Sequence, residues 1–357
     1  MTKKRGDDQY GYDPERAAAR SLFDHLERQA EQRPDKPARK LGDVLKLPKV
    51  TPTTKRLIDA HAEIIDSPAD DIAFLHTVLC QTGLPYRPTD KRVWIRDQGN
   101  ASLLIEAGHA RHPGTGEWVE LGLPHGERPR LILIHLSTEA VRTGLPAIDV
   151  SGSLTAFARS LGIDTNGPSI RRFKDQLARL AASTVRLGVI ADGRTTQINT
   201  QIVSGIDLWM PKDADQRILW PSTVTLSADY FASLQRHAVP LDPRAIKALA
   251  GSALALDVYV WLAQRLHRVP KGKPQMITWA ALQAQFGPDY DRPRDFRRKF
   301  VSAIKTILTV YPGARVEAAD AGLMLRNSPP PIMKKLVSVP RLDRPTIDGT
   351  ATKITDV

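Results

Sequence analysis

The densest group of chemically active side chains in this sequence is a cationic segment near its C-terminal end. Six Lys and Arg side chains lie between positions 292 and 305, and Asp295 is the one acid among them. Arginine in the major groove can donate two hydrogen bonds to guanine O6 and N7, whereas lysine more often contacts backbone phosphates. These residue types favour a surface that binds double-stranded DNA. The predicted contacts in this segment are Arg292, Arg294, Arg297, Arg298, Lys299, Ser302 and Lys305.

One helix is expected to hold these side chains on one side of the protein. From Arg294 to Val310, apolar residues recur every three or four positions, and polar residues occupy the opposite face. A charged helix face can also serve only to keep a surface hydrated, but six cations against one acid favour contact with DNA. The apolar face consists of Phe296, Phe300, Ala303, Ile304, Ile307 and Leu308, and the opposite face carries Arg294, Arg298, Ser302 and Lys305.

A short helix and a β-hairpin flank this long helix. Apolar residues from Trp279 to Phe286 are spaced along one helix face, and Gly287 ends that helix. Downstream, residues 314–318 and 323–326 predict two short strands joined by a tight turn. Two helices joined by a turn form a helix-turn-helix, and the hairpin after them predicts a winged helix.

The same order of elements occurs once earlier in the chain. Residues 154–161 predict a short helix, and a longer helix begins at Ser169 as its N-cap. Residues 185–190 and 195–203 then predict a hairpin around an Asp-Gly turn. Asp175 lies among the cations of the longer helix, so the sequence leaves open whether this helix contacts DNA or another protein. The predicted DNA contacts of this first module are Arg171, Arg172, Arg179 and Arg194.

These patterns predict an α+β fold with two tandem winged-helix domains, a flexible N-terminal arm and a C-terminal tail. Further helices are expected over 69–82, 131–142, 226–237 and 245–266, and short strands over 92–96 and 101–107. The predicted organisation is a flexible basic arm (1–60), a small α/β segment packed on the first module (61–125), winged helix 1 (126–210), winged helix 2 as the main DNA reader (211–328), and a disordered tail (329–357).

Composition supports a nucleic-acid partner. The 357 residues carry a formal net charge of +12, and residues 271–328 hold ten Lys and Arg against five acids. The single cysteine, Cys80, excludes a disulfide within the chain and fits a reducing cytoplasm. The sequence has neither a secretory signal pattern nor an apolar run long enough to cross a bilayer, so no membrane partner is expected.

Motifs for catalysis are missing from the sequence. It contains no phosphate-binding loop of the G-x-x-x-x-G-K type, no dinucleotide fingerprint and no G-x-S-x-G nucleophile turn. His109 and His112 have no cysteine pair to complete a metal site, and Asp70-Asp71 has the position of a helix start. We therefore expect no enzyme activity, no cofactor and no bound metal.

Several long blocks of the sequence resemble the RepA family of plasmid-encoded replication proteins. The resemblance covers roughly residues 65–332, and its specificity lies in the order of the blocks rather than in any one of them. The blocks are FLHTVLCQTGLPYR (74–87), SLLIEAGHA (102–110), PRLILIHLSTEAVRTG (129–144), WPSTVTLSADYFASLQRHAVPLD (220–242), ALALDVYVWLAQRLHR (253–268), WAALQAQFG (279–287) and RDFRRKF (294–300).

This resemblance implies an initiator that binds repeated sites at a plasmid origin and helps to open the duplex. It also implies host replication proteins as partners, including the replicative helicase. In related initiators one winged helix reads the repeats and the other supports dimerisation, so a homodimer is expected. Arg294, Arg297 and Arg298 correspond by position to the recognition helix. A transcriptional repressor that controls copy number or its own synthesis could use the same modules and remains the alternative.

Overall fold

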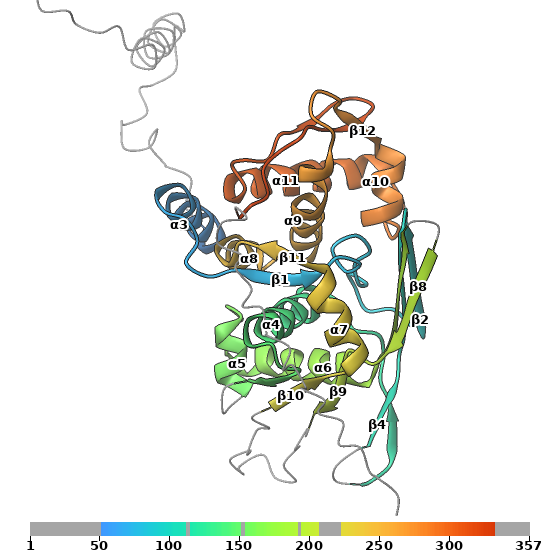
Figure 1. Cartoon of the computed structure of the whole chain (residues 1–357). Coiled ribbons are helices and arrows are strands. Elements are labelled where there is room, and N and C mark those ends of the chain that lie inside the picture. Colours follow the sequence, from blue (N-terminus) through green and yellow to red (C-terminus); the bar gives the residue numbers. More distant parts are fainter. Residues whose placement is uncertain (1–50, 112–114, 151–153, 192–193, 207–222, 333–357) are drawn as a thin grey trace, which may run out of the picture. The chain divides into compact units, whose positions relative to one another are not determined.

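The computed structural model describes residues 51–111, 115–150, 154–191, 194–206 and 223–332 (Figure 1). Within these ranges the chain forms helices and antiparallel sheets, which confirms the predicted α+β class. Residues 1–50 of the predicted arm (1–60) and residues 333–357 of the predicted tail (329–357) lie outside the described residues. The first residues of the predicted tail are not disordered, because the Tyr311 hydroxyl donates to the Pro329 oxygen and Ile332 is buried.

A two-stranded antiparallel ribbon lies between the two halves of the described structure. Strand β1 (Ala73–His76) pairs with β11 (Ala238–Leu241), and all four residues of β1 are buried. Helix α4 (Glu127–Thr143) packs against β1, while α9 (Ala253–Arg265) packs against β11 (Figure 1). One hydrophobic core therefore continues from the half that contains α4 to the half that contains α9.

The first helix pair is followed by the predicted hairpin, but this hairpin is part of a larger sheet. Helices α5 (Leu154–Ser160) and α6 (Gly167–Ala182) lead into β7 (Thr184–Ala191) and β8 (Arg194–Thr200). Strand β7 also pairs with β3, which gives the order β2-β3-β7-β8. The remaining strands of this half are β2 (Val93–Gln98), β3 (Ala101–Glu106), β4 (His109–Arg111), β5 (Trp118–Glu120), β6 (Ala147–Asp149), β9 (Val203–Ile206) and β10 (Thr223–Leu226).

The second helix pair has a simpler sheet. Helices α10 (Trp279–Phe286) and α11 (Pro293–Val310) precede a hairpin of β13 (Val316–Ala318) and β14 (Gly322–Leu325). Strand β12 (Gln275–Thr278) pairs with β14, so the order is β12-β14-β13. The short helix, the long basic helix and the hairpin all lie where the sequence predicts them. The remaining helices are α3 (Pro52–Asp66), α7 (Ala228–His237), α8 (Pro243–Leu249) and the 3-10 turn η1 (Leu266–Arg268).

The helix predicted over residues 69–82 is wrong, because this segment contains strand β1 followed by turns. Phe74 donates its backbone N–H to Thr138 Oγ1 on α4 at 2.8 Å, and β1 pairs with a strand far along the chain. A segment that is buried on both faces is apolar throughout, so its sequence period does not distinguish strand from helix.

Two helix boundaries also differ from the prediction. The N-cap of α6 is Asn166 and not Ser169: its Oδ1 accepts a hydrogen bond from the Ser169 backbone N–H at 2.9 Å. The helix predicted over 245–266 is two helices, because Ser252 caps the start of α9 through the Ala255 N–H. In both places a polar side chain accepts a hydrogen bond from a free N–H group in the first turn of the helix.

Helix α3 is not predicted from the sequence, which assigns residues 52–60 to a flexible arm. Thr51 is its N-cap and Pro52 occupies the first turn, where its fixed φ angle suits a helix start. The buried side of α3 contacts α8 and α11. The predicted boundary at residue 60 thus falls within a helix, whereas the other domain boundaries stay predictions.

Candidate nucleic-acid interface

Helix α11 is held firmly by its apolar face. Phe296, Phe300 and Ile307 are at most 1 % exposed, and Phe300 contacts Phe286 of α10 with ring centroids 5.6 Å apart. At position 287 even a Cβ atom would lie 2.2 Å from the Phe296 ring, so glycine allows the short helix to close onto the long one. This packing fixes which side of α11 faces the solvent.

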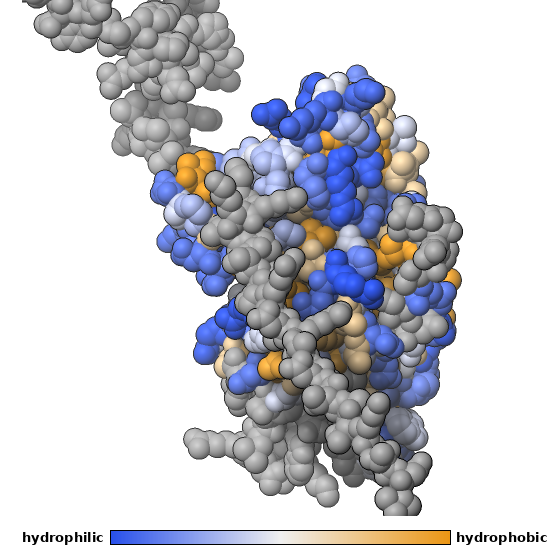
Figure 2. Space-filling view, in the orientation of Figure 1, coloured by the Kyte–Doolittle hydropathy of each residue, from blue (hydrophilic) through white to orange (hydrophobic). Residues whose placement is uncertain are grey.

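The opposite side of α11 is exposed and cationic, and on the face drawn in Figure 2 the upper part of the molecule, where Figure 1 labels α11, is largely hydrophilic. All seven predicted contacts of this segment are exposed, and together they form what we call the cationic face. Among the described residues, four of its cations have no ion-pair partner, so their charge is available to a ligand. These four are Arg292, Arg294, Lys299 and Lys305.

Two arginines of the cationic face have acidic neighbours. Arg298 lies 3.1 Å from Asp295, one turn before it on the same helix. Both side chains are largely exposed, and an exposed pair of this kind contributes at most about 1 kcal/mol, so a ligand can displace it. Arg297 is held more firmly, because it pairs with Asp320 at 3.2 Å and stacks on the Trp279 ring at 5.0 Å.

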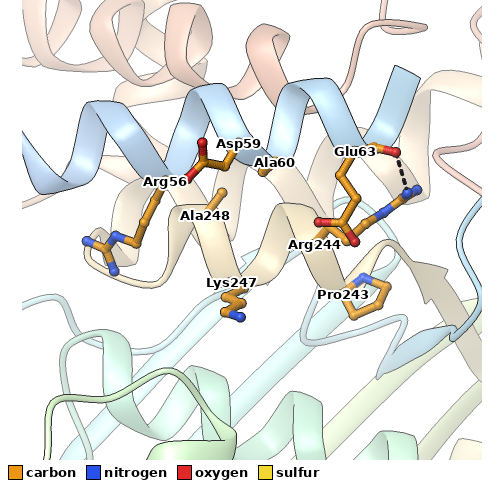
Figure 3. A pocket seen from close by; sticks show the side chains of 8 residues that line it. All are labelled: Arg56, Asp59, Ala60, Glu63, Pro243, Arg244, Lys247 and Ala248. Atoms are coloured by element: carbon orange, nitrogen blue, oxygen red, sulfur yellow. Dashed lines mark hydrogen bonds between the residues drawn. The ribbon is translucent and has the colours of Figure 1, made fainter. Parts of the chain in front are cut away.

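The C-terminal end of α11 is covered by α3. The Nδ1 atom of His61 is 2.6 Å from the backbone oxygen of Thr309, in the last turn of α11, where helix carbonyls lack partners. Helix α3 is in turn held by Arg244 of α8, which donates to the backbone oxygen of Glu63 (Figure 3) and also to that of Ser67. No local sequence pattern indicates this cap, because His61 and Thr309 are far apart along the chain.

The cleft between α3 and α8 has charges of both signs. Arg56 and Lys247 line it together with the carboxylates of Asp59 and Glu63 (Figure 3). Because acids offset the cations there, this cleft is electrostatically different from the cationic face of α11.

The first helix pair presents fewer available cations than the second. Arg171 and Arg172 are exposed on α6, as expected. Arg179 is different, because its Nε atom is 2.9 Å from both carboxylate oxygens of Asp175, one turn earlier. Arg194 is the first residue of β8, and its side chain lies outside the described part of the chain.

A buried ion pair joins the two halves of the structure. Arg130 of α4 donates from Nε and Nη2 to the two oxygens of Asp257 on α9, at 2.6 and 2.7 Å. The guanidinium also donates to the backbone oxygens of Leu84, Pro85 and Gly126. Burial alone lowers the pKa of Arg130, but Asp257 outweighs this effect and the pKa is raised. Arg130 therefore stays charged with every N–H group bonded.

Other kinds of site are not evident in the described residues. They contain no group of three His, Cys, Asp or Glu side chains that could hold a metal ion. None of the helices within the described ranges has the length and apolar character needed to span a membrane. Cys80 is buried, and this burial raises the pKa of its thiol, so it lacks the properties of a reactive cysteine.

An α+β fold with two helix pairs, each followed by a β-hairpin, and one exposed cationic helix face is typical of proteins that dock a helix on DNA. Residues 123–281 match the family described as "Plasmid encoded RepA protein", which confirms the family resemblance seen in the sequence. The matched segment includes the first helix pair and α9, and it ends within α10, before α11 begins.

Two solved structures were found to be similar to this chain. The chain is similar to domains 2 and 3 of RctB with a TM-score of 0.44 and 10% identity, over 70% of this chain and 97% of that one. A second structure of RctB domains 2–3 has a TM-score of 0.42 and 10% identity, over 70% of this chain and 94% of that one. No curated protein matches the chain.

Proposed function

We propose that this protein binds double-stranded DNA by placing α11 in the major groove. The observation that carries the proposal is the cationic face, which is exposed along a helix whose other side is fully packed. The order α9, β12, α10, α11, β13 and β14, with β12 paired to β14, supports a winged-helix interpretation of this half. An α-helix with its side chains fits the width of the groove.

The residues of the cationic face divide by chemistry. Arg294 and Arg298 lie at the centre of the exposed side, where a guanidinium can donate to the O6 and N7 atoms of guanine. Lys299 and Lys305 are point charges suited to phosphates, as is Arg292 in the turn before the helix. In this arrangement the centre of the cationic face contacts bases, and the residues around it contact phosphates.

We further propose that the protein initiates replication of a plasmid by binding repeats at its origin. The match of residues 123–281 to the RepA family supports a RepA-type initiator. In this proposal the bound protein promotes opening of the duplex and recruits host replication proteins, including the replicative helicase, in the cytoplasm. The first helix pair is proposed to contribute to a homodimer, and the protein is proposed to act without enzyme activity of its own.

Two assays test this function together. The first measures binding of the full chain to duplexes that contain its origin repeats, and the second asks whether the chain, supplied in trans, maintains a plasmid that has only the origin. Specific binding with plasmid maintenance is expected. Failure of both would contradict the proposal, and binding beside a promoter without any effect on copy number would instead indicate a repressor.

A matched pair of variants links the assays to α11. Arg294→Ala/Arg298→Ala should abolish preference for the repeats, because each arginine supplies a base contact. Lys91→Ala/Arg236→Ala removes the same charge from exposed positions outside both cationic helices and should bind like the unchanged protein. Nicking of origin DNA or hydrolysis of nucleotides by the purified chain would contradict the absence of enzyme activity.

A further inference from the structure

The turn of the β13–β14 hairpin is acidic and lies against α11. It consists of Ala319, Asp320 and Ala321 and contains no cation. The Asp320 side chain is fully exposed, and its Oδ1 atom is 3.2 Å from Nη2 of Arg297. One arginine of the cationic face is therefore engaged by a carboxylate of the same chain.

Several contacts fix this turn in place. Trp279 donates from Nε1 to the backbone oxygen of Ala319 at 3.1 Å, and its backbone N–H bonds the oxygen of Ala321 at 3.3 Å. The Arg297 guanidinium stacks on the Trp279 ring and also lies 3.4 Å from the Ala319 oxygen. Arg297 is thus held by a ring, a carboxylate and a carbonyl at once, unlike the other cations of α11.

The position of this cluster matters for DNA binding. An α-helix with its side chains is about 10–12 Å across and the major groove about 12 Å wide, so residues at the flank of a docked helix meet the phosphates of the groove wall. Arg297 lies at the flank of the cationic face, on the side of the hairpin turn. A docked α11 would bring Asp320 close to phosphates, where like charges repel.

We propose that Asp320 determines specificity by limiting the attraction of α11 for the DNA backbone. It engages Arg297, which then positions the hairpin turn rather than binding a phosphate, and it adds a negative charge at the groove wall. Sequence-independent affinity comes from phosphate contacts, so their restriction leaves the base contacts of Arg294 and Arg298 to decide where the protein binds. This inference rests on the proposed function of α11.

The test compares binding of Asp320→Asn and of the unchanged chain to a repeat duplex and to a random duplex over a range of salt. The variant should bind the random duplex more tightly, because Arg297 becomes available to a phosphate. One added phosphate contact steepens the plot of log K against log salt by about 0.9. The ratio of repeat to random affinity should fall, and Asp320→Glu should restore it.

Two further variants test whether the change in affinity is specific to Asp320 and requires Arg297, and thermal unfolding tests whether Asp320→Asn changes stability. Glu317→Gln removes one negative charge from the same hairpin, where Glu317 faces Arg326 at 3.9 Å, and it should leave the affinity ratio unchanged. Arg297→Ala/Asp320→Asn should return the salt dependence toward that of the unchanged chain, since the released arginine is gone. Thermal unfolding should be nearly the same for Asp320→Asn, because its side chain is fully exposed.

Two results would overturn the inference. One is that Asp320→Asn leaves the random-duplex affinity and its salt dependence unchanged, and the other is that Glu317→Gln changes both by the same amount. The unchanged chain provides the separate check on the proposed function. If that chain shows no preference for the repeats, the function of α11 fails, whereas preference with no effect at Asp320 rejects the role of Asp320 alone.

Discussion

The two helix pairs follow the same order of elements, but their hairpins have different surroundings. After α6, strand β7 pairs with β3 as well as with β8, so the hairpin belongs to a four-stranded sheet. After α11, the hairpin pairs with β12 alone, and its turn bonds back to α10 and α11. The same local pattern of two helices and a hairpin thus adds two strands to a larger sheet in one half. In the other half it places a hairpin turn beside a cationic helix.

The long helices α6 and α11 also differ in the positive charge that they expose. On α6 the carboxylate of Asp175 takes up Arg179, which leaves Arg171 and Arg172 as exposed cations. On α11 the exposed cations outnumber the acids, and the Arg298 pair is weak and exposed. Because each helix has at least one paired arginine, we conclude that the number of available cations, more than charge pairing, distinguishes the two helices as candidate DNA contacts.

The largest expected effect tests the link between the halves. Arg130→Met leaves the buried Asp257 without its partner and should lower the free energy of unfolding by about 3–5 kcal/mol. Replacing both residues, as in Arg130→Met/Asp257→Leu, should cost less, because no unpaired buried charge remains. Urea unfolding measures both variants, and a double variant less stable than Arg130→Met would contradict the account.

The next effect concerns the phosphate contacts of α11. Lys299→Ala/Lys305→Ala should weaken binding to repeat and random duplexes by the same factor. Each phosphate contact contributes about 0.9 to the slope of log K against log salt, so the slope should fall by about two. A loss confined to the repeat duplex would instead assign these lysines to base contacts.

A smaller effect is expected from α6. Arg171→Ala/Arg172→Ala should retain the full preference for repeats, and its salt slope should fall by less than in the lysine variant, because Asp175 lies on the same exposed side. Titration of both duplexes measures this change. If preference for the repeats disappears, α6 reads bases as well and the contrast between the two helices is wrong.

The smallest effect is that of the cap on α11. His61→Ala removes the contact with the Thr309 oxygen and should cost about 0.5–1.5 kcal/mol of stability, the usual net value of one hydrogen bond. The exposed His109 on β4 provides the control, since His109→Ala should have no measurable effect. Equal unfolding curves for both variants would show that α3 does not stabilise α11 through His61.

Much of the second half could be predicted from the sequence because its signals are local. The apolar period of α11 and the glycine that ends the preceding helix are both patterns of residues close together in the sequence. The structure has the helix and Gly287 where these patterns place them. The predicted exposure of Arg294 and Arg298 follows from the same period. Local periodicity suffices where one face of an element is buried and the other is exposed.

The features that could not be predicted depend on distant parts of the chain. Strand β1 forms because it pairs with β11, and α3 is ordered by its contacts with α8 and α11. The engagement of Arg297 by Asp320 requires the hairpin to fold back onto α11, which a helical projection of α11 alone does not contain. The sequence pattern therefore predicts the cationic face and the flanking position of Arg297, but not the acidic partner of Arg297.

The central claim is that α11 reads bases, and Arg298→Ala tests it most directly. Binding of this variant is measured on a set of duplexes in which every base pair of the repeat is changed in turn. The account predicts a loss of about 1–3 kcal/mol on the repeat and relaxed discrimination at one base position. A uniform loss on every duplex, with discrimination intact at all positions, would contradict it.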